Sequence, residues 1–218
     1  KIELLTHPLT CWTGFGGLPD FAALEDEHFK QVFEAAMAAH AAEIEAIADN
    51  PDAPTLENTL AALELSGDPL GRVSSIFWLR SGAHTNDLIQ TLEREFAPAL
   101  SRHYSAVSMT PKLFARIDTL YREREALAKH TETRRVIEKS WKGFVRSGAK
   151  LNAEEQKQFS TINERLSVLG ATFGQNVLAD EKIPALILAD SEELAGLPDW
   201  LKAAMASAAT ERGHEGKF

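Results

Sequence analysis

The sequence predicts an all-α protein made mainly of long antiparallel helices. Apolar residues recur at steps of three and four residues over most of the chain, which is the spacing of one face of an α-helix. Capping residues, prolines and glycines divide this pattern into stretches with short connections, and short connections favour antiparallel neighbours. One segment differs: the apolar run Ile183–Leu188, which begins Ile183-Pro184, is expected to be extended.

Residues 1–24 are predicted to form an irregular N-terminal arm. Gly14-Phe15-Gly16-Gly17 and the following Pro19 disfavour regular structure there. We expect four of the arm's side chains to hold it on the protein surface. They are Cys11, Trp12, Phe15 and Phe21.

A helical domain is predicted over residues 25–182, and its first helix begins at Asp26. The apolar stripe of this helix consists of Phe29, Phe33, Met37, His40, Ile44 and Ile47. Asp49-Asn50-Pro51 ends the helix, because the residue before a proline disfavours the helical conformation. Thr55 is the predicted N-cap of the next helix, which Ser66-Gly67-Asp68-Pro69 kinks or interrupts.

Capping residues also mark the helices in the middle of the chain. We expect helix starts at Thr85-Asn86-Asp87, at Thr110-Pro111 and at Thr131. Pro98 is expected to kink the helix in which it lies. Gly148 stands where a left-handed C-cap would end the helix that Thr131 opens.

The last long helix is predicted to start at an Asn152 cap and to bury an apolar stripe. This stripe consists of Phe159, Ile162, Leu166, Leu169, Phe173 and Val177. Residues 183–218 are then expected to contain the short extended segment and the terminal helices. Ser191 and Pro198 flank these helices, and Gly213 ends them.

Composition excludes two classes of partner. A formal net charge of −9 argues against nucleic acid, because binding to phosphates depends on clustered Lys and Arg. Charged residues interrupt every apolar stretch before the roughly 20 residues that span a bilayer, so no membrane partner is expected. Cys11 is the single cysteine and no apolar signal region opens the chain, which favours a cytoplasmic protein. Residue 1 is not Met, which leaves a processed leader open.

The sequence contains only incomplete metal motifs. A zinc peptidase helix needs His-Glu-x-x-His, which places two imidazoles on the metal and a carboxylate beside the attacking water. His214-Glu215 begins this motif, but Phe218 occupies the second histidine position, and the flanking glycines favour a loop. Glu25-x-x-His28 and Glu211-x-x-His214 have the spacing of di-iron bundles, but they lie at a helix start and a helix end. We therefore assign no catalytic, cofactor-binding or metal-binding residue to this chain.

Other polar groups are better explained by structure than by chemistry. His40 lies on an apolar stripe near Glu43 and is expected to be a satisfied, partly buried histidine. His84-Thr85-Asn86-Asp87 is interpreted as helix capping. The alternating charges of Arg122-Glu123-Arg124-Glu125 are typical of a solvated helix face.

Two more motifs of the arm lack the partner residues that a catalytic or binding role needs. Cys11 has no local nucleophile motif, and the nearby His7 does not supply one. Gly14-Phe15-Gly16-Gly17 lacks the further glycine or lysine of a phosphate-binding loop, which favours a flexible turn.

Several stretches taken together resemble one known family. They include Pro8-Leu9-Thr10, Gly17-Leu18-Pro19-Asp20-Phe21, Ala42-Glu43-Ile44-Glu45-Ala46-Ile47-Ala48, Glu57-Asn58-Thr59, Arg72-Val73-Ser74-Ser75-Ile76-Phe77, Ala83-His84-Thr85-Asn86-Asp87, Phe144-Val145-Arg146-Ser147-Gly148-Ala149-Lys150-Leu151, Phe173-Gly174-Gln175-Asn176-Val177-Leu178 and Leu194-Ala195-Gly196-Leu197-Pro198. These residues resemble the thimet oligopeptidase family of zinc metallopeptidases, and most closely its bacterial peptidyl-dipeptidase branch. The resemblance covers essentially the whole chain.

This resemblance implies the N-terminal helical region of a neurolysin-like or thimet-oligopeptidase-like fold. In such an enzyme two lobes enclose a deep channel that admits short peptides, and the branch removes dipeptides from their C-termini. Residues 25–182 would form one wall of the channel, and residues 183–218 would lead into a C-terminal catalytic half that carries the zinc. The segment alone is then expected to be inactive, to bind no cofactor, and to expose the apolar surface that faces the missing half.

Two other interpretations remain open on the sequence. The first is a self-contained helical scaffold or binding module without catalysis, for which the coding sequence would stop near Phe218. The second is a di-metal bundle, which would contain stoichiometric iron or manganese.

Overall fold

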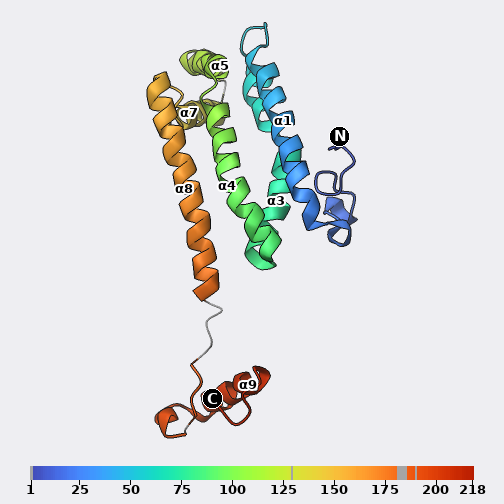
Figure 1. Cartoon of the computed structure of the whole chain (residues 1–218). Helices are drawn as coiled ribbons and strands as arrows, with labels where there is room; N and C mark the ends of the chain where they lie inside the picture. Colours follow the sequence, from blue (N-terminus) through green and yellow to red (C-terminus); the bar gives the residue numbers. More distant parts are fainter. Residues whose placement is uncertain (1, 129, 181–185, 190) are drawn as a thin grey trace. The chain divides into compact units, whose positions relative to one another are not determined.

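The computed structural model describes residues 2–128, 130–180, 186–189 and 191–218, and the regular structure in these ranges is helical (Figure 1). The all-α prediction is confirmed. Two compact units divide the chain, Lys1–Phe173 and Gly174–Phe218. Within the described ranges, no helix is both long enough and apolar enough to cross a membrane.

The N-terminal arm contains turns and two short 3-10 segments, Phe15–Gly17 and Phe21–Ala23. Leu9 anchors the arm, because its side chain is fully buried in the first hydrophobic core. Trp12 packs against the same core, and the guanidinium carbon of Arg72 lies 5.4 Å from its ring centroid. The expectation that Phe15 and Phe21 hold the arm on the surface is wrong. Both side chains are exposed, that of Phe15 by 97%.

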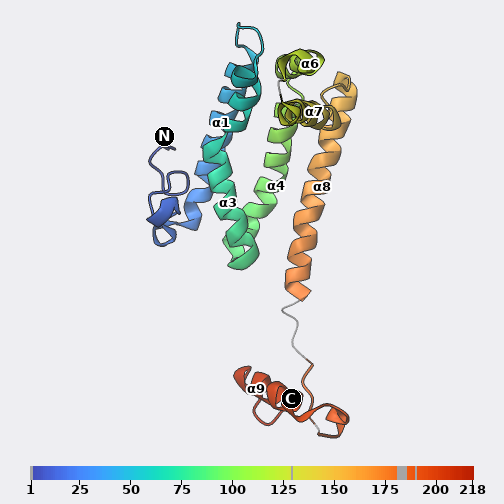
Figure 2. The same cartoon turned by 180° about the vertical axis from the view of Figure 1, so that it is seen from behind.

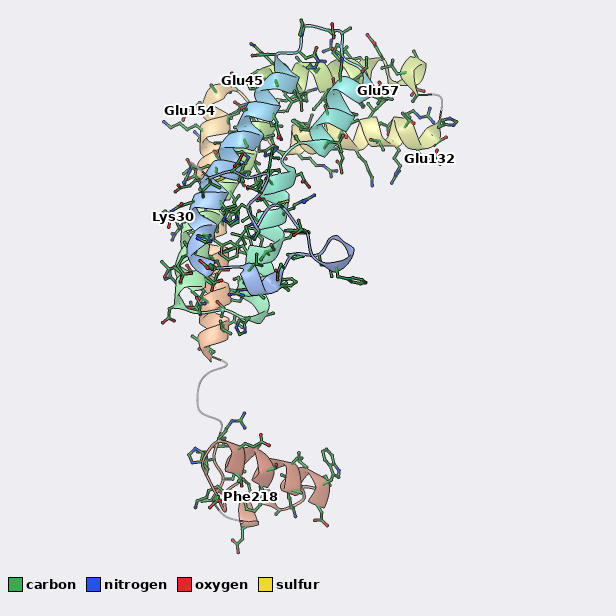
Figure 3. All side chains as sticks on the ribbon, turned by 90° about the vertical axis from the view of Figure 1, so that its right-hand side faces the viewer. Lys30, Glu45, Glu57, Glu132, Glu154 and Phe218 are labelled. Carbon is green, nitrogen blue, oxygen red and sulfur yellow. The ribbon has the colours of Figure 1, made fainter. Side chains whose placement is uncertain are left out.

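The first core lies between α1 (Phe29–Ala48), α3 (Asp68–Ala83) and α4 (Asp87–Ser108), which Figures 1 and 2 show side by side. A short 3-10 turn, Asp26–His28, precedes α1. The predicted stripe of α1 is confirmed, because all its members are buried except Met37, which packs half-buried against the core. At the centre, the ring of Phe33 lies 4.4 Å from that of Phe96 and 5.4 Å from that of Phe77. Lys30, labelled in Figure 3, pairs with Glu95 at the rim.

Capping and a left-handed glycine shape the connection from α1 to α3. As predicted, Thr55 begins the next helical segment, and it does so through a capping box with Asn58. The segment runs as a π-helix over Leu56–Ala61 and as α2 over Ala62–Leu65. Gly67 then interrupts the helix with a φ of 72°. The predicted interruption at residues 66–69 is therefore confirmed.

The second core joins the C-terminal end of α1 and Leu60 to α5 (Pro111–Arg122) and α7 (Thr131–Arg146), and the short α6 (Arg124–Leu127) lies between these two helices in the chain. Tyr121 and Trp141 stack face to face there, with ring centroids 4.1 Å apart. The indole N–H of Trp141 donates to Asp118 at 2.8 Å, so the polar edge of this half-buried ring is satisfied. Gly148 follows α7 with a φ of 95°, as a left-handed C-cap requires.

Two details of the second core differ from the sequence-based expectations. Thr110 stands at the N-cap of α5, but its hydroxyl donates to the Ala106 carbonyl at 2.9 Å and does not cap α5. The charged residues 122–125 do not form one solvated helix face, because the chain breaks between α5 and α6 at Glu123. Arg124 turns inward there and lies over the ring of Tyr121 at 4.2 Å.

The long helix α8 (Ala153–Asp180) begins as predicted, because Asn152 and Glu155 cap it reciprocally. Its first part lies beside α4 in Figures 1 and 2, and Arg102 of α4 bonds Glu164 of α8 at 3.0 Å. The prediction that its apolar stripe is buried is wrong. Ile162, Leu166, Leu169, Phe173 and Val177 are exposed, and Phe159 is only half-buried.

The second unit contains a short 3-10 turn, Ser191–Leu194, and α9 (Asp199–Glu211). Leu194 is its most buried large side chain among the described residues. Leu188 and Phe218 exchange two backbone hydrogen bonds of 2.9 and 3.0 Å, so Leu188 of the expected extended run is paired as a strand residue would be. The start of that run, Ile183-Pro184, lies outside the described residues. Gly213 ends α9 with a φ of 81°, as predicted.

Candidate functional site

The incomplete metal motifs of the sequence do not assemble into a larger set of ligands. His28 and Glu25 approach to 3.5 Å, but both side chains are largely exposed to solvent. His214 lies in the turn after α9, where it lines a small apolar hollow of about 140 Å³ with Phe218 and Met205. Across the part of the chain that the structure describes, no group of three or more His, Cys, Asp or Glu residues could hold a metal ion.

The most concentrated polar cluster joins α1, α4 and the turn before α3. His40 Nδ1 and His103 Nε2 lie 2.8 Å apart, so one ring donates a hydrogen bond to the other. His40 Nε2 faces the hydroxyl of Ser66 at 3.3 Å. Glu43 accepts a hydrogen bond from the amide of Gly67 at 2.7 Å, and Tyr104 packs against both imidazoles. The expected partly buried, satisfied His40 is confirmed.

The electrostatics of this cluster favour neutral histidines. Burial lowers the pKa of His40, and the nearby Glu43 opposes this only in part. Burial also lowers the pKa of His103, with a further contribution from the charge that His40 would carry. Burial raises the pKa of Tyr104. These shifts favour the neutral forms of His40, His103 and Tyr104 at neutral pH.

The arrangement of Ser66, His40 and His103 resembles a catalytic triad of nucleophile, base and orienting group. Their hydrogen bonds do not support catalysis by such a triad. The hydroxyl of Ser66 donates to the Leu63 carbonyl at 2.7 Å, which is shorter than its 3.3 Å separation from His40. An activated serine must instead present its proton to the base. The amide of Gly67, which could have stabilised an oxyanion, already bonds Glu43. The arrangement is best explained as the end cap of α2.

His103 is the member of this cluster that the sequence-based reasoning missed. It follows Leu92, Phe96 and Leu100 at steps of four, four and three residues along α4. The same periodicity that placed His40 on the buried face of α1 could therefore have placed His103 on the buried face of α4.

The remaining sequence motifs have structural partners. Asn86 caps α4 by accepting from the amide of Ile89 at 2.9 Å, and it also bonds Asp26, so the capping interpretation is confirmed. His7 Nδ1 accepts from the amide of Leu9 at 3.2 Å. Cys11 is half-buried in the same turn.

The glycine-rich motif of the arm forms a turn. The carbonyl of Gly14 accepts from Gly17, and the amide of Gly14 donates to the carbonyl of Leu18 at 2.9 Å. Gly16 and Gly17 both have positive φ values. The prediction of a turn at this motif is thus confirmed.

A polar hollow of about 370 Å³ lies between α4, the end of α7 and the first part of α8. Its lining is Ser101, Tyr104, Ser105, Ser108, Arg146, Ser147, Phe159 and Asn163. This lining can offer hydrogen bonds and one positive charge. The hollow is wide open to solvent, so it can admit a polar group but does not enclose a small ligand.

Comparison with known proteins gives more information about the chain's family than its polar clusters do. No family model matches the sequence. The dipeptidyl carboxypeptidase of Escherichia coli is 36% identical over 200 residues, which cover 92% of this chain and 29% of that protein. The corresponding protein of Salmonella typhimurium is 34% identical with the same coverage. Oligopeptidase A of Salmonella typhimurium is 29% identical over 213 residues, which are 97% of this chain and 31% of that protein.

The chain thus spans less than a third of the length of the relatives that it matches. Nearly the whole chain takes part in each match, and its all-helical structure agrees with the fold that the resemblance implied. The chain is homologous to the N-terminal part of dipeptidyl carboxypeptidases and oligopeptidases A, which confirms its resemblance to the thimet oligopeptidase family.

Proposed function

We propose that this chain is the N-terminal, channel-forming part of a cytoplasmic, zinc-dependent peptidyl-dipeptidase or oligopeptidase that hydrolyses short peptides. The 36% identity to a dipeptidyl carboxypeptidase over 92% of the chain carries this proposal. In this role the chain supplies helices that shape the channel and limit access to short peptides. The polypeptide beyond it supplies the metal and the groups that break the peptide bond.

The donor groups within the described residues do not fit a catalytic zinc ion. Such an ion needs three protein ligands and an open position, whereas the closest acidic and imidazole pair, Glu25 and His28, is solvent-exposed and has no third donor. The imidazoles of His40 and His103 bond each other through His40 Nδ1 and His103 Nε2, and His40 Nε2 faces the Ser66 hydroxyl, so these nitrogens are engaged within the protein. We therefore place the metal in the catalytic half, and we derive no catalytic step from this chain's own residues.

Several buried contacts support a role as a rigid wall. Arg116 of α5 is almost fully buried, and its guanidinium donates to the carbonyls of Asn50 and Asp52 at 2.8 and 3.0 Å and to the Asn58 side chain at 2.9 Å. One side chain thereby fixes the whole connection between α1 and α2 relative to α5. A fixed connection of this kind preserves the spacing of helices, as a channel wall requires.

The test compares the full-length protein with the 218-residue chain. The full-length protein with zinc is expected to release C-terminal dipeptides from an N-terminally blocked short peptide, to lose this activity on chelation, and to regain it when zinc is restored. It is expected to leave a folded protein intact. The 218-residue chain with zinc is expected to give no turnover, and robust hydrolysis by it would refute the proposal.

A further inference from the structure

The apolar stripe of α8 is the largest ordered set of exposed apolar side chains on one described helix. The exposed members of this stripe in the first unit are Ile162, Leu166, Leu169 and Phe173, which are 58%, 59%, 46% and 71% exposed. Steps of four, three and four residues place these side chains on one face of the helix. A contiguous apolar patch of this kind marks an interaction site.

The opposite face of α8 packs against the other helices of the first unit. Glu164 bonds Arg102 of α4, and Asn163 shares the polar hollow with Tyr104 of α4. Ala171 is the one buried residue of the helix. The helix therefore packs through a small and polar face and leaves its apolar face in water, which is the reverse of the usual amphipathic arrangement.

A glycine beside the stripe also favours an interaction site on this helix. Gly170 lies in the interior of α8, where glycine is about 1 kcal/mol less favourable than alanine. A Cβ atom added at this position would have no heavy atom of a described residue within 4 Å, so packing within the first unit does not require a glycine there. A second element that approaches the helix backbone closely at this position would require one.

We infer that this apolar face of α8 is the docking surface for the C-terminal part of the same protein. The inference rests on the proposed function, because it takes that part to be the catalytic half. The first relatives exceed the chain more than threefold in length, and under the proposed function a downstream polypeptide of comparable size packs against this unit. The stripe lies on the last helix of the unit, which is the helix from which that polypeptide continues.

Thiol labelling in the full-length protein tests the docking surface directly. The test uses a protein in which Cys11 is replaced by Ser and every other cysteine is also replaced. In this background the single thiol of Leu166→Cys measures how accessible the stripe is. Glu154→Cys, in the exposed first turn of the same helix, is the matched control. Because a buried thiol is inaccessible to reagents, maleimide is expected to label Leu166→Cys at least about tenfold more slowly than Glu154→Cys in the full-length protein. The two are expected to react within about twofold of each other in the 218-residue chain.

A pair of charged substitutions provides a second measurement. Leu166→Asp with Phe173→Asp is expected to leave the thermal midpoint of the 218-residue chain nearly unchanged, since both side chains are exposed there. The same pair is expected to lower the midpoint of the full-length protein by several degrees, because it places charges in an apolar interface. Equal midpoints in the full-length protein would overturn the inference.

The outcomes separate this inference from the proposed function. Fast labelling of Leu166→Cys in a full-length protein that hydrolyses peptides would overturn the docking surface and leave the function. Slow labelling in a protein without peptidase activity would refute the function and leave the docking surface. A dimer of the 218-residue chain that protects Leu166→Cys would show that a second copy is the occupant, and a gene that ends at Phe218 would remove the occupant altogether. Both results would overturn the inference.

Discussion

The imidazoles of His40 and His103 bond each other at 2.8 Å across the contact between α1 and α4. Each ring comes from a different helix, so this single hydrogen bond links two of the three helices of the first core. Burial lowers the pKa of both rings. The link is therefore made by neutral imidazoles and is lost when both carry a proton.

We predict that the free energy of unfolding falls when the pH is lowered from 7.5 to 5.5. Because both histidines have a pKa below the ordinary value of 6.5 in the folded protein, the unfolded chain binds more protons around and below that pH. The contribution of the pair is complete above pH 6.5 and decreases as the pH falls through that value. Urea titrations at several pH values measure the slope.

His103→Gln is the informative variant for this pH dependence. Glutamine keeps a polar group that can bond His40, but it does not titrate. The variant is expected to fold at pH 7.5 and to show a shallower loss of stability toward pH 5.5. A slope equal to that of the unmodified chain would show that the pair does not control acid stability.

Gly67 is predicted to tolerate no side chain. Its φ of 72° is unfavourable for other residues, and an added Cβ would lie 3.0 Å from the His40 ring. Gly67→Ala is therefore expected to destabilise the fold by about 1–3 kcal/mol. Gly71→Ala is the matched control, since this site lies within α3 with no atom within 4 Å of the new Cβ. That change is expected to stabilise the helix by about 0.5–1 kcal/mol.

Urea denaturation of the two alanine variants measures both changes in the free energy of unfolding. Equal stability of Gly67→Ala and the unmodified chain would mean that the turn before α3 can rearrange, and that the contact with His40 does not constrain it.

Local signals predicted the helices well, whereas burial depended on what surrounds each helix. The capping residues Thr55, Asn86 and Asn152 each act within three residues, so their sequence neighbourhood contains the whole interaction. The stripes of α1 and α8 are equally periodic. That of α1 is buried because α3, α4 and α5 cover it, and that of α8 is exposed because the other helices of the first unit do not cover it.

The long-range polar contacts could not be predicted for the same reason. Arg116 is bonded by groups between 57 and 66 residues away in the sequence, and His103 lies 63 residues from His40. Periodicity can place each side chain on a buried face, but it does not specify which helix lies opposite. The family resemblance, in contrast, depends on residue identities along the chain, and the relatives confirm it.

Arg116 is predicted to be the most costly single polar residue to remove. Arg116→Ala would remove the guanidinium that donates to the buried Thr59 hydroxyl, to the Asn58 side chain and to two partly buried backbone carbonyls. Unsatisfied buried groups of this kind cost about 1–3 kcal/mol each and are not additive, so a loss of about 2–4 kcal/mol is expected.

Arg116→Lys separates the charge of this residue from its geometry. Lysine keeps the positive charge but cannot reach the same set of acceptors with a planar fork. It is expected to recover less than half of the lost stability in denaturant titrations. Full recovery by lysine would mean that charge alone stabilises the connection between α1 and α2.

The aromatic centre of the first core is predicted to dominate its packing energy. Phe33 is fully buried and contacts the rings of Phe77 and Phe96, so Phe33→Ala would remove these contacts and leave a cavity. Such truncations cost about 3–5 kcal/mol. Phe15→Ala removes the same side chain from a position that is 97% exposed, and it is expected to change stability by less than about 0.5 kcal/mol. If the two variants unfold at the same denaturant concentration, the three helices α1, α3 and α4 do not share the tightly packed core described above.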